Sequence, residues 1–227
     1  MITPRWGDDI EQRDITIDIT LTERGDASGT IVETLRGQDA ISRRNFLDEQ
    51  GSDDKIRKYF ERKVNYDFNG SQLDSYTIDG REDPDRALVL TYTFTRAGYA
   101  RKEQNALVIE DRYALRDLTR SFARLPNRTV PMLLNQTIND QVTINLSVPE
   151  GMTIAGPGNE DNIVYGSDFG DYQRVVSRDE NTMTINHTLY IPIQRIQPDA
   201  YAVFANWAGD VDRATYKRLE VSRRQAP

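Results

Sequence analysis

Alternation of apolar and polar residues is the feature that most restricts the fold of this chain. The pattern runs without a break from Met183 to Ile191 and again from Asp14 to Thr22. Because successive side chains of a strand point to opposite faces, each run predicts a strand with one buried face. His187 falls on the apolar side of the first run. In the second run the apolar side consists of Ile15, Ile17, Ile19 and Leu21.

The residues that follow Thr22 predict the return strand of a hairpin and then helices. Arg24-Gly25-Asp26 has turn chemistry, and a second strand from Gly29 to Leu35 completes a hairpin over residues 14 to 35. After Gly37 the apolar residues recur at a period of about 3.6, and Ser52 is a fair helix N-cap. We therefore expect two short helices between about residues 38 and 66.

The remaining runs predict further strands and one closing helix. Pro198 opens a pattern in which Tyr201, Phe204 and Trp207 share one helical stripe. The fold class predicted is mainly β (α+β), with antiparallel, β-sandwich-like sheets, a helical excursion near residues 38–66 and a closing helix near 198–212. We expect nine or ten strands, and the others lie at about 73–78, 88–94, 106–109, 142–148, 152–154, 172–177 and 216–221.

Changes of pattern along the chain suggest four segments. Residues 1–12 resemble a linker or disordered start, and residues 223–227 a tail. Residues 13–104 form a subregion of hairpin, helices and strands, and residues 105–222 a β-sandwich-like subregion with the closing helix. No linker rich in Pro and Ser separates these two subregions, so we expect one elongated domain or two that share an interface.

Composition excludes several function classes. The formal net charge is -7 and the basic residues are scattered, which argues against nucleic acid as a partner. The sequence contains no cysteine, which excludes disulfides, thiolate metal sites and a Cys nucleophile. The first ten residues lack a basic start followed by an apolar run, and no stretch approaches the length of a membrane span. We expect no export signal in this sequence, which could be a segment of a longer exported protein.

Few residues in the sequence suggest a catalytic or ligand-binding role. His187 is the single histidine, and its place among apolar strand positions favours a core role over a catalytic one. The aromatic stripe of Tyr201, Phe204 and Trp207 is more typical of a core than of a sugar platform. We expect no cofactor. Weak candidates for calcium ligands are the four carboxylates of a Gly-rich loop, although a solvated loop is favoured: Glu160, Asp161, Asp168 and Asp171.

Several motifs in this order resemble a known family. They include Arg128-Thr-Val-Pro131, Val148-Pro149-Glu150-Gly151, Tyr190-Ile-Pro192, Pro198-Asp-Ala-Tyr201 and Phe204-Ala-Asn-Trp207. The chain resembles the C-terminal region of bacterial transglutaminase-like envelope proteins, which carry an N-terminal β-rich domain of unknown function. In that family the papain-like Cys-His-Asp triad belongs to a central domain, and none of it can be assigned to this cysteine-free chain. The resemblance implies a periplasmic or otherwise extracytoplasmic location.

Three functions remain open from the sequence. The first is a non-catalytic accessory or interaction module whose partner is the neighbouring transglutaminase-like domain, or another envelope protein or glycan. The second is a β-sandwich module that binds a polysaccharide or peptide. The third is a hydrolase that uses carboxylates, although 36 Asp and Glu residues give no means of choosing a pair. We expect that the chain is not an enzyme.

Overall fold

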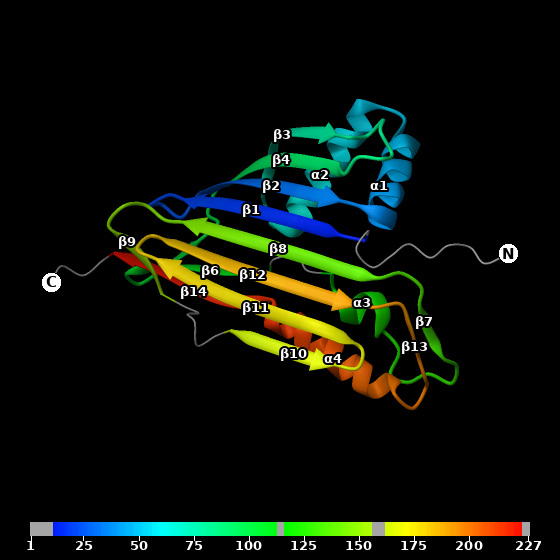
Figure 1. Cartoon of the computed structure of the whole chain (residues 1–227). Helices are drawn as coiled ribbons and strands as arrows, with labels where there is room; N and C mark the ends of the chain where they lie inside the picture. The colour runs from blue at the N-terminus through cyan, green and yellow to red at the C-terminus, as the bar shows by residue number, and fades with distance from the viewer. Residues whose placement is uncertain (1–10, 113–115, 156–161, 224–227) are drawn as a thin grey trace.

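A computed structural model describes residues 11–112, 116–155 and 162–223 of the chain. Fourteen strands and four helices occupy this part (Figure 1). They are β1 (Arg13–Leu21), β2 (Ala27–Leu35), α1 (Gly37–Gln50), α2 (Asp53–Asp67), β3 (Gln72–Asp79), β4 (Leu88–Arg96), β5 (Arg101–Glu103), β6 (Ala106–Arg112), α3 (Leu118–Phe122), β7 (Met132–Leu134), β8 (Ile138–Ser147), β9 (Met152–Ala155), β10 (Ile163–Ser167), β11 (Gly170–Asp179), β12 (Thr182–Ile191), β13 (Gln194–Ile196), α4 (Tyr201–Ala214) and β14 (Tyr216–Arg223).

The strands form three sheets. The largest has eight strands in the order β10-β11-β12-β8-β1-β2-β4-β3, and the second has four in the order β5-β6-β14-β9. A two-stranded ribbon pairs β13 with β7. The predicted hairpin is confirmed, because β1 and β2 pair antiparallel from Arg13 and Leu35 to Leu21 and Ala27. The predicted mainly β fold class is confirmed as well.

One strand pair in the described part differs from the antiparallel pattern. β1 lies parallel to β8, with Ile15 opposite Val142 and Ile19 opposite Leu146. A parallel pair needs a long connection between its strands, and residues 22–137 supply it here. The consequence is that strands of both predicted subregions lie in one continuous sheet (Figure 1).

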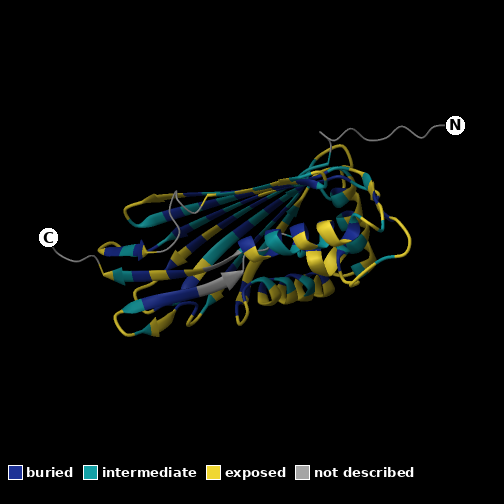
Figure 2. Cartoon of the chain, turned by 90° about the horizontal axis from the view of Figure 1, so that it is seen from below, coloured by how far each residue is buried: buried dark blue, intermediate teal, exposed yellow. Residues whose placement is uncertain are grey.

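The helices and the four-stranded sheet lie against the same side of the eight-stranded sheet (Figures 1 and 2). This arrangement buries the apolar face of the long strands. On β12 the five predicted positions are all buried, from Met183 through His187 to Ile191. The opposite face carries polar residues that bond across strands: Thr143 Oγ1 donates to Asn186 Oδ1 at 2.9 Å, and Thr184 Oγ1 donates to Asn145 Oδ1 at 2.9 Å.

The predicted helices are present, with shifted boundaries. Ser52 caps α2 by accepting a 3.4 Å hydrogen bond from the backbone N–H of Lys55. The closing helix α4 starts at Tyr201, after a turn over residues 198–200. Its aromatic stripe is buried, as predicted, and Trp207 Nε1 donates to the Tyr165 carbonyl at 3.3 Å. Within the described ranges, none of the helices combines the length and apolar content that a membrane span requires.

The alternation of apolar and polar residues did not predict the shortest strands. The strand count of nine or ten was too low, because β5, β7 and β13 have three residues each and give no readable alternation. The predicted Gly-rich loop between Glu160 and Asp171 contains β10, whose neighbour β11 supplies its hydrogen bonds from one side. No clear period runs through Leu118 and Phe122 in the sequence, and the structure has the short helix α3 there (Leu118–Phe122).

Candidate functional site

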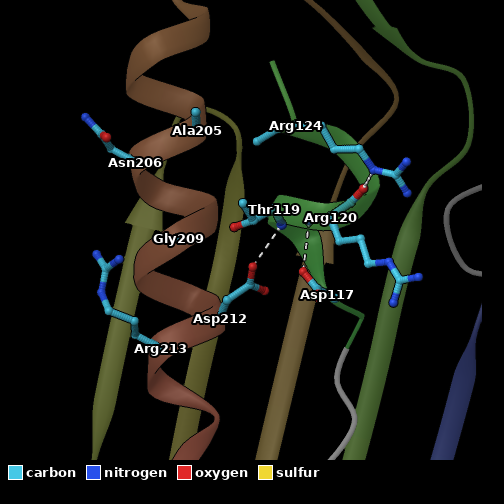
Figure 3. A pocket seen from close by; sticks show the side chains of 10 residues that line it. Asp117, Thr119, Arg120, Arg124, Ala205, Asn206, Gly209, Asp212 and Arg213 are labelled. Carbon is cyan, nitrogen blue, oxygen red and sulfur yellow. Dashed lines mark hydrogen bonds between the residues drawn. The ribbon is translucent and has the colours of Figure 1, made fainter. Parts of the chain in front are cut away.

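An open cleft with a polar lining lies between α3 and α4 (Figure 3). Its volume is about 680 Å³. The residues that line it come from two short stretches of sequence: Asp117, Thr119, Arg120, Ala123, Arg124, Ala205, Asn206, Gly209, Asp212 and Arg213. We call this surface the α3–α4 cleft.

Two carboxylates hold the first turn of α3, and one of them comes from α4. Asp117 is the N-cap of α3, and its Oδ1 accepts from the Arg120 N–H at 2.9 Å. Asp212 reaches across from α4: its Oδ1 accepts from the Leu118 N–H at 2.9 Å and its Oδ2 from the Thr119 N–H at 2.8 Å. The first N–H groups of a helix have no partner within the helix. Asp212 satisfies two of them, which holds a five-residue helix that would be marginal alone.

Long polar side chains border the cleft on both sides. In Figure 3, Arg120 and Arg124 extend from α3 away from α4, whereas Asn206 and Arg213 extend from the opposite side of α4. Thr119, Gly209 and Asp212 lie between these two borders. The surface is therefore a shallow floor with long polar side chains at both edges, which suits a segment lying across both helices better than a single small ion.

The arginines of α3 have neutral hydrogen-bond partners. Arg120 Nη1 donates to the Tyr66 hydroxyl at 3.1 Å, and Arg124 Nε donates to the Arg120 carbonyl. Neither guanidinium contacts a carboxylate among the described residues. Arg213 differs, because it pairs with Asp210 on α4. Two cations of a protein with a net charge of -7 are therefore open to a carboxylate from outside.

Gly209 widens the cleft at its floor. Glycine inside a helix costs about 0.5–1 kcal/mol relative to alanine. A Cβ at this position would lie 3.3 Å from Nη1 of Arg213, which is the end of a flexible side chain, so packing does not demand glycine. The space above Gly209 is left to the cleft.

Two of the four predicted calcium ligands lie in the described part of the structure, and the calcium site stays a prediction. Asp168 lies in the turn between β10 and β11, and Asp171 is the second residue of β11. Glu160 and Asp161 lie outside the described residues. Among the residues the structure describes, no three His, Asp or Glu side chains group as metal ligands would. Neither Asp168 nor Asp171 lines the α3–α4 cleft.

His187 lies in the core, as predicted. It is 2% exposed, and its Nδ1 lies 2.9 Å from the Tyr172 hydroxyl. Burial, with a smaller contribution from the nearby Arg174 guanidinium, lowers the pKa of His187 to about 4. Arg174 is itself buried and donates to the Ala214 carbonyl, at the C-terminal end of α4, at 2.7 Å. A helix C-terminus stabilises a cation, so this contact accounts for part of the cost of burying Arg174.

A second buried polar group lies under α2. Glu33 is 1% exposed, accepts from the Tyr92 hydroxyl at 2.6 Å and pairs with Lys63 at 2.8 Å. Burial alone would raise the pKa of Glu33, but the charges of Lys63, Arg13 and Arg43 lower it to about 2. Lys63 also pairs with Asp67 at 2.9 Å. The charge of Lys63 thus offsets those of Glu33 and Asp67 inside the fold, and we assign this group to stability.

A third group joins β1 and β8. Asp140 is buried and accepts from Arg13 Nη1 at 3.0 Å and from Arg116 Nε at 2.9 Å. Arg116 also pairs with Asp39 at the start of α1. The carboxylate of β8 thus connects the parallel strand pair to the helical excursion.

Reasoning from sequence missed the α3–α4 cleft, although part of its signal was present. Asp117 followed by Arg120 and Arg124 combines a helix N-cap with two arginines four residues apart, a spacing that puts both on one side of a helix. The other half of the cleft lies more than eighty residues later, at Ala205 to Arg213. Only the packing of α4 against α3 brings the halves together.

Comparisons with known proteins give a family for the chain. No curated protein matches it. A solved structure described as a "putative protease" from Parabacteroides distasonis ATCC 8503 aligns with a TM-score of 0.26 and 11% identity over 95% of this chain and 41% of that protein. The chain thus spans about two fifths of its length. Residues 107–221 match DUF3858, a domain of unknown function with a solved structure. Those residues include every residue of the α3–α4 cleft, and the chain belongs to the DUF3858 family.

Proposed function

We propose that this chain is a non-catalytic accessory module that binds a neighbouring transglutaminase-like (papain-like cysteine) domain of the same longer bacterial protein. The α3–α4 cleft is the contact surface, and an acidic segment of that domain is its occupant. On this proposal the protein works outside the cytoplasm, as the resemblance implies. The observation that carries the proposal is the pair Arg120 and Arg124, two guanidiniums at a cleft edge without a carboxylate partner among the described residues.

Charge and shape both support an acidic segment as the occupant. A guanidinium forms paired hydrogen bonds with a carboxylate, and such charge-assisted bonds are about twice as strong as neutral ones. The neutral partners of Arg120 and Arg124 can be exchanged for carboxylates without breaking an ion pair. The splayed borders in Figure 3 leave a floor across which an extended segment can lie. The absence of cysteine from the sequence fits a module that has no thiol nucleophile of its own.

The direct test is a titration of the labelled chain with the separately produced neighbouring domain, followed by NMR chemical shifts and by cross-linking. We expect shifted amides in residues 117–124 and 205–213. When two domains are joined by a short flexible linker, the effective concentration of one at the other is about 1 mM. The titration must therefore reach that range. No contact at about 1 mM contradicts the proposal.

Two variants separate the cleft from other surfaces. Arg120→Glu combined with Arg124→Glu should weaken binding by about a hundredfold, since each lost charge-assisted contact costs about tenfold. The matched control is Lys55→Glu with Arg62→Glu, which makes the same charge change on the exposed side of α2. It should leave affinity within about threefold. Equal losses in both pairs would show that only net charge matters and would contradict a role for the cleft.

Gly209→Leu tests the floor without altering charge. Leucine favours a helix over glycine, so the fold should remain, while the side chain fills the space over α4. Unchanged affinity in this variant would place the contact elsewhere.

A further inference from the structure

A second concave surface lies where the two larger sheets separate at one end. It is lined by the turn after β1 and by one end of the four-stranded sheet, and its volume is about 930 Å³. We call it the inter-sheet cleft. Its residues include Arg24, Lys102, Gln104, Leu107, Met152 and Arg223. None of them lines the α3–α4 cleft, so the two surfaces are separate.

Strand register places the lining side chains on one face of the four-stranded sheet. Lys102 of β5 is opposite Leu107 of β6, and Leu107 is opposite Val221 of β14. Residues directly opposite each other in an antiparallel pair share a face. Arg223 shares it as well, because it lies two residues after Val221 and opposite Met152 of β9. One face therefore presents a buried apolar row of Leu107 and Val221 bordered by two cations.

The turn between β1 and β2 closes the other side. The Ala100 N–H donates to the Gly25 carbonyl at 2.8 Å, which fixes the turn against the segment leading into β5. A Cβ on Gly25 would lie 2.4 Å from the Ala100 carbonyl oxygen, so this approach requires glycine. Arg24 lies in this turn and lines the cleft together with Lys102.

Charge in the inter-sheet cleft has the opposite sign to the whole protein. Arg24, Lys102 and Arg223 against Glu23 leave two net positive charges among the lining residues, while the chain carries -7. The pair between Arg223 and Glu23 is long, at 3.5 Å, and exposed. Arg24 and Lys102 contact no carboxylate among the described residues.

Backbone strain marks the same place. The two-residue turn between β5 and β6 has Gln104 at φ 50°, where glycine is usual. A non-glycine residue held in this region costs on the order of 1 kcal/mol, and such residues gather at functional sites. Gln104 and Asn105 both line the cleft, and each carries a side-chain amide that could bond to a ligand.

We propose that the inter-sheet cleft binds a small organic anion that combines a carboxylate with a short apolar chain. The cations at the edge receive the carboxylate, and the parts of Leu107 and Met152 that reach the cleft surface receive the apolar part. The volume lies in the range of sites for small molecules, about 300–1,000 Å³. This site is independent of the proposed contact with a neighbouring domain.

The test uses the whole chain, labelled for NMR and titrated with three probes. Octanoate carries both features, acetate only the carboxylate, and octyl glucoside only the apolar chain with a neutral head. We expect saturable octanoate binding, with shifts in residues 102–107, 152–153 and 221–223, at least about tenfold tighter than either other probe. Equal binding of acetate or of octyl glucoside overturns the proposal, as does the absence of a saturable shift.

Variants locate the site. Lys102→Gln with Arg223→Gln should weaken octanoate binding by about a hundredfold, two contacts at about tenfold each. The control Lys55→Gln with Arg62→Gln should leave it unchanged, and so should Arg120→Glu with Arg124→Glu, which tests the other cleft. Should the double variant fold poorly, Lys102→Glu alone gives the same test. Wild-type affinity in a folded Lys102 variant contradicts the assignment.

Discussion

The hydroxyl of Tyr172 on β11 lies 2.9 Å from Nδ1 of His187 on β12, in the interior of the fold. Both side chains are buried, and their rings lie roughly parallel with centroids 6.1 Å apart. The hydroxyl can donate to Nδ1 only while that nitrogen is unprotonated. The single histidine of the chain thus makes the fold sensitive to acid.

We predict that stability falls as the pH is lowered from about 6.5 through 4. Burial and Arg174 lower the pKa of His187 to about 4, whereas an unfolded histidine has a pKa near 6.5. Between these values the unfolded chain binds more protons, so unfolding is favoured by acid. Between pH 7 and 4.5 this contributes about 2–3 kcal/mol to the free energy of unfolding.

His187→Asn removes that contribution while keeping an acceptor near the Tyr172 hydroxyl. Urea unfolding at pH 7, 5.5 and 4.5 should show a flatter pH dependence in the variant than in the wild type. If the free energy of unfolding depended on pH equally in both proteins, the lowered pKa of His187 would not be the cause of the acid sensitivity.

The Glu33 group gives a prediction for the stability under α2. Glu33→Gln leaves Lys63 buried with only Asp67 as an anionic partner. Breaking a buried ion pair costs about 3–5 kcal/mol. We expect a loss near the lower end, about 3 kcal/mol, because glutamine can still accept from Tyr92.

The pH dependence of this variant has a defined sign. The pKa of Glu33 in the fold is lowered to about 2, so its contribution is complete above about pH 4.5 and is lost as the pH falls towards 2. Glu33→Gln should reduce the loss of stability in that window. Glu61→Gln, which breaks an exposed pair with Arg57 on α2, should change stability by less than about 0.5 kcal/mol. Comparable losses in the two variants would argue against a buried ionic group.

Asp212→Ala should loosen α3 from α4. The substitution leaves the N–H groups of Leu118 and Thr119 without their acceptor, which costs about 1–2 kcal/mol. Hydrogen exchange of residues 118–123 should accelerate more than exchange in β8 or β12. Asp210→Ala, which removes only an exposed pair with Arg213, is the control and should leave exchange in α3 unchanged.

Two glycines should respond in opposite ways to alanine. Gly209→Ala should stabilise the chain by about 0.5–1 kcal/mol, because alanine favours the helix and only the end of Arg213 must move. Gly170→Ala should destabilise it, because a Cβ there would lie 2.3 Å from the Tyr190 carbonyl oxygen. Thermal melts of the two variants give the comparison. Destabilisation by Gly209→Ala would mean that α4 is packed more tightly at the cleft than the structure shows.

The spacing of apolar residues identified the long strands and helices, because it follows the period of the backbone over many residues. Alternation located β1 and β12, and the stripe of Tyr201, Phe204 and Trp207 located α4 and its buried face. His187 was placed in the core for the same reason. Three-residue strands such as β7 and β13 span too few residues for any period, so only their partner strands define them.

The candidate site could not be predicted because it depends on contacts distant in sequence. Asp212 satisfies N–H groups of Leu118 and Thr119 that lie 94 and 93 residues earlier. The charges of Arg120 and Arg124 were visible, but whether a carboxylate faces them depends on how α4 packs. The same holds for Lys102 and Arg24, which are distant in sequence and line one cleft only in the folded chain.

The parallel pairing of β1 with β8 has a consequence for the order of events on the ribosome. Hydrogen bonds such as that from Asn145 to Asp18 join residues 127 positions apart. One side of β1 must wait until β8 has been synthesised and has left the exit tunnel. During that interval the nascent hairpin offers an unpaired edge to other chains, which makes this stage the one at which a holding chaperone is most useful.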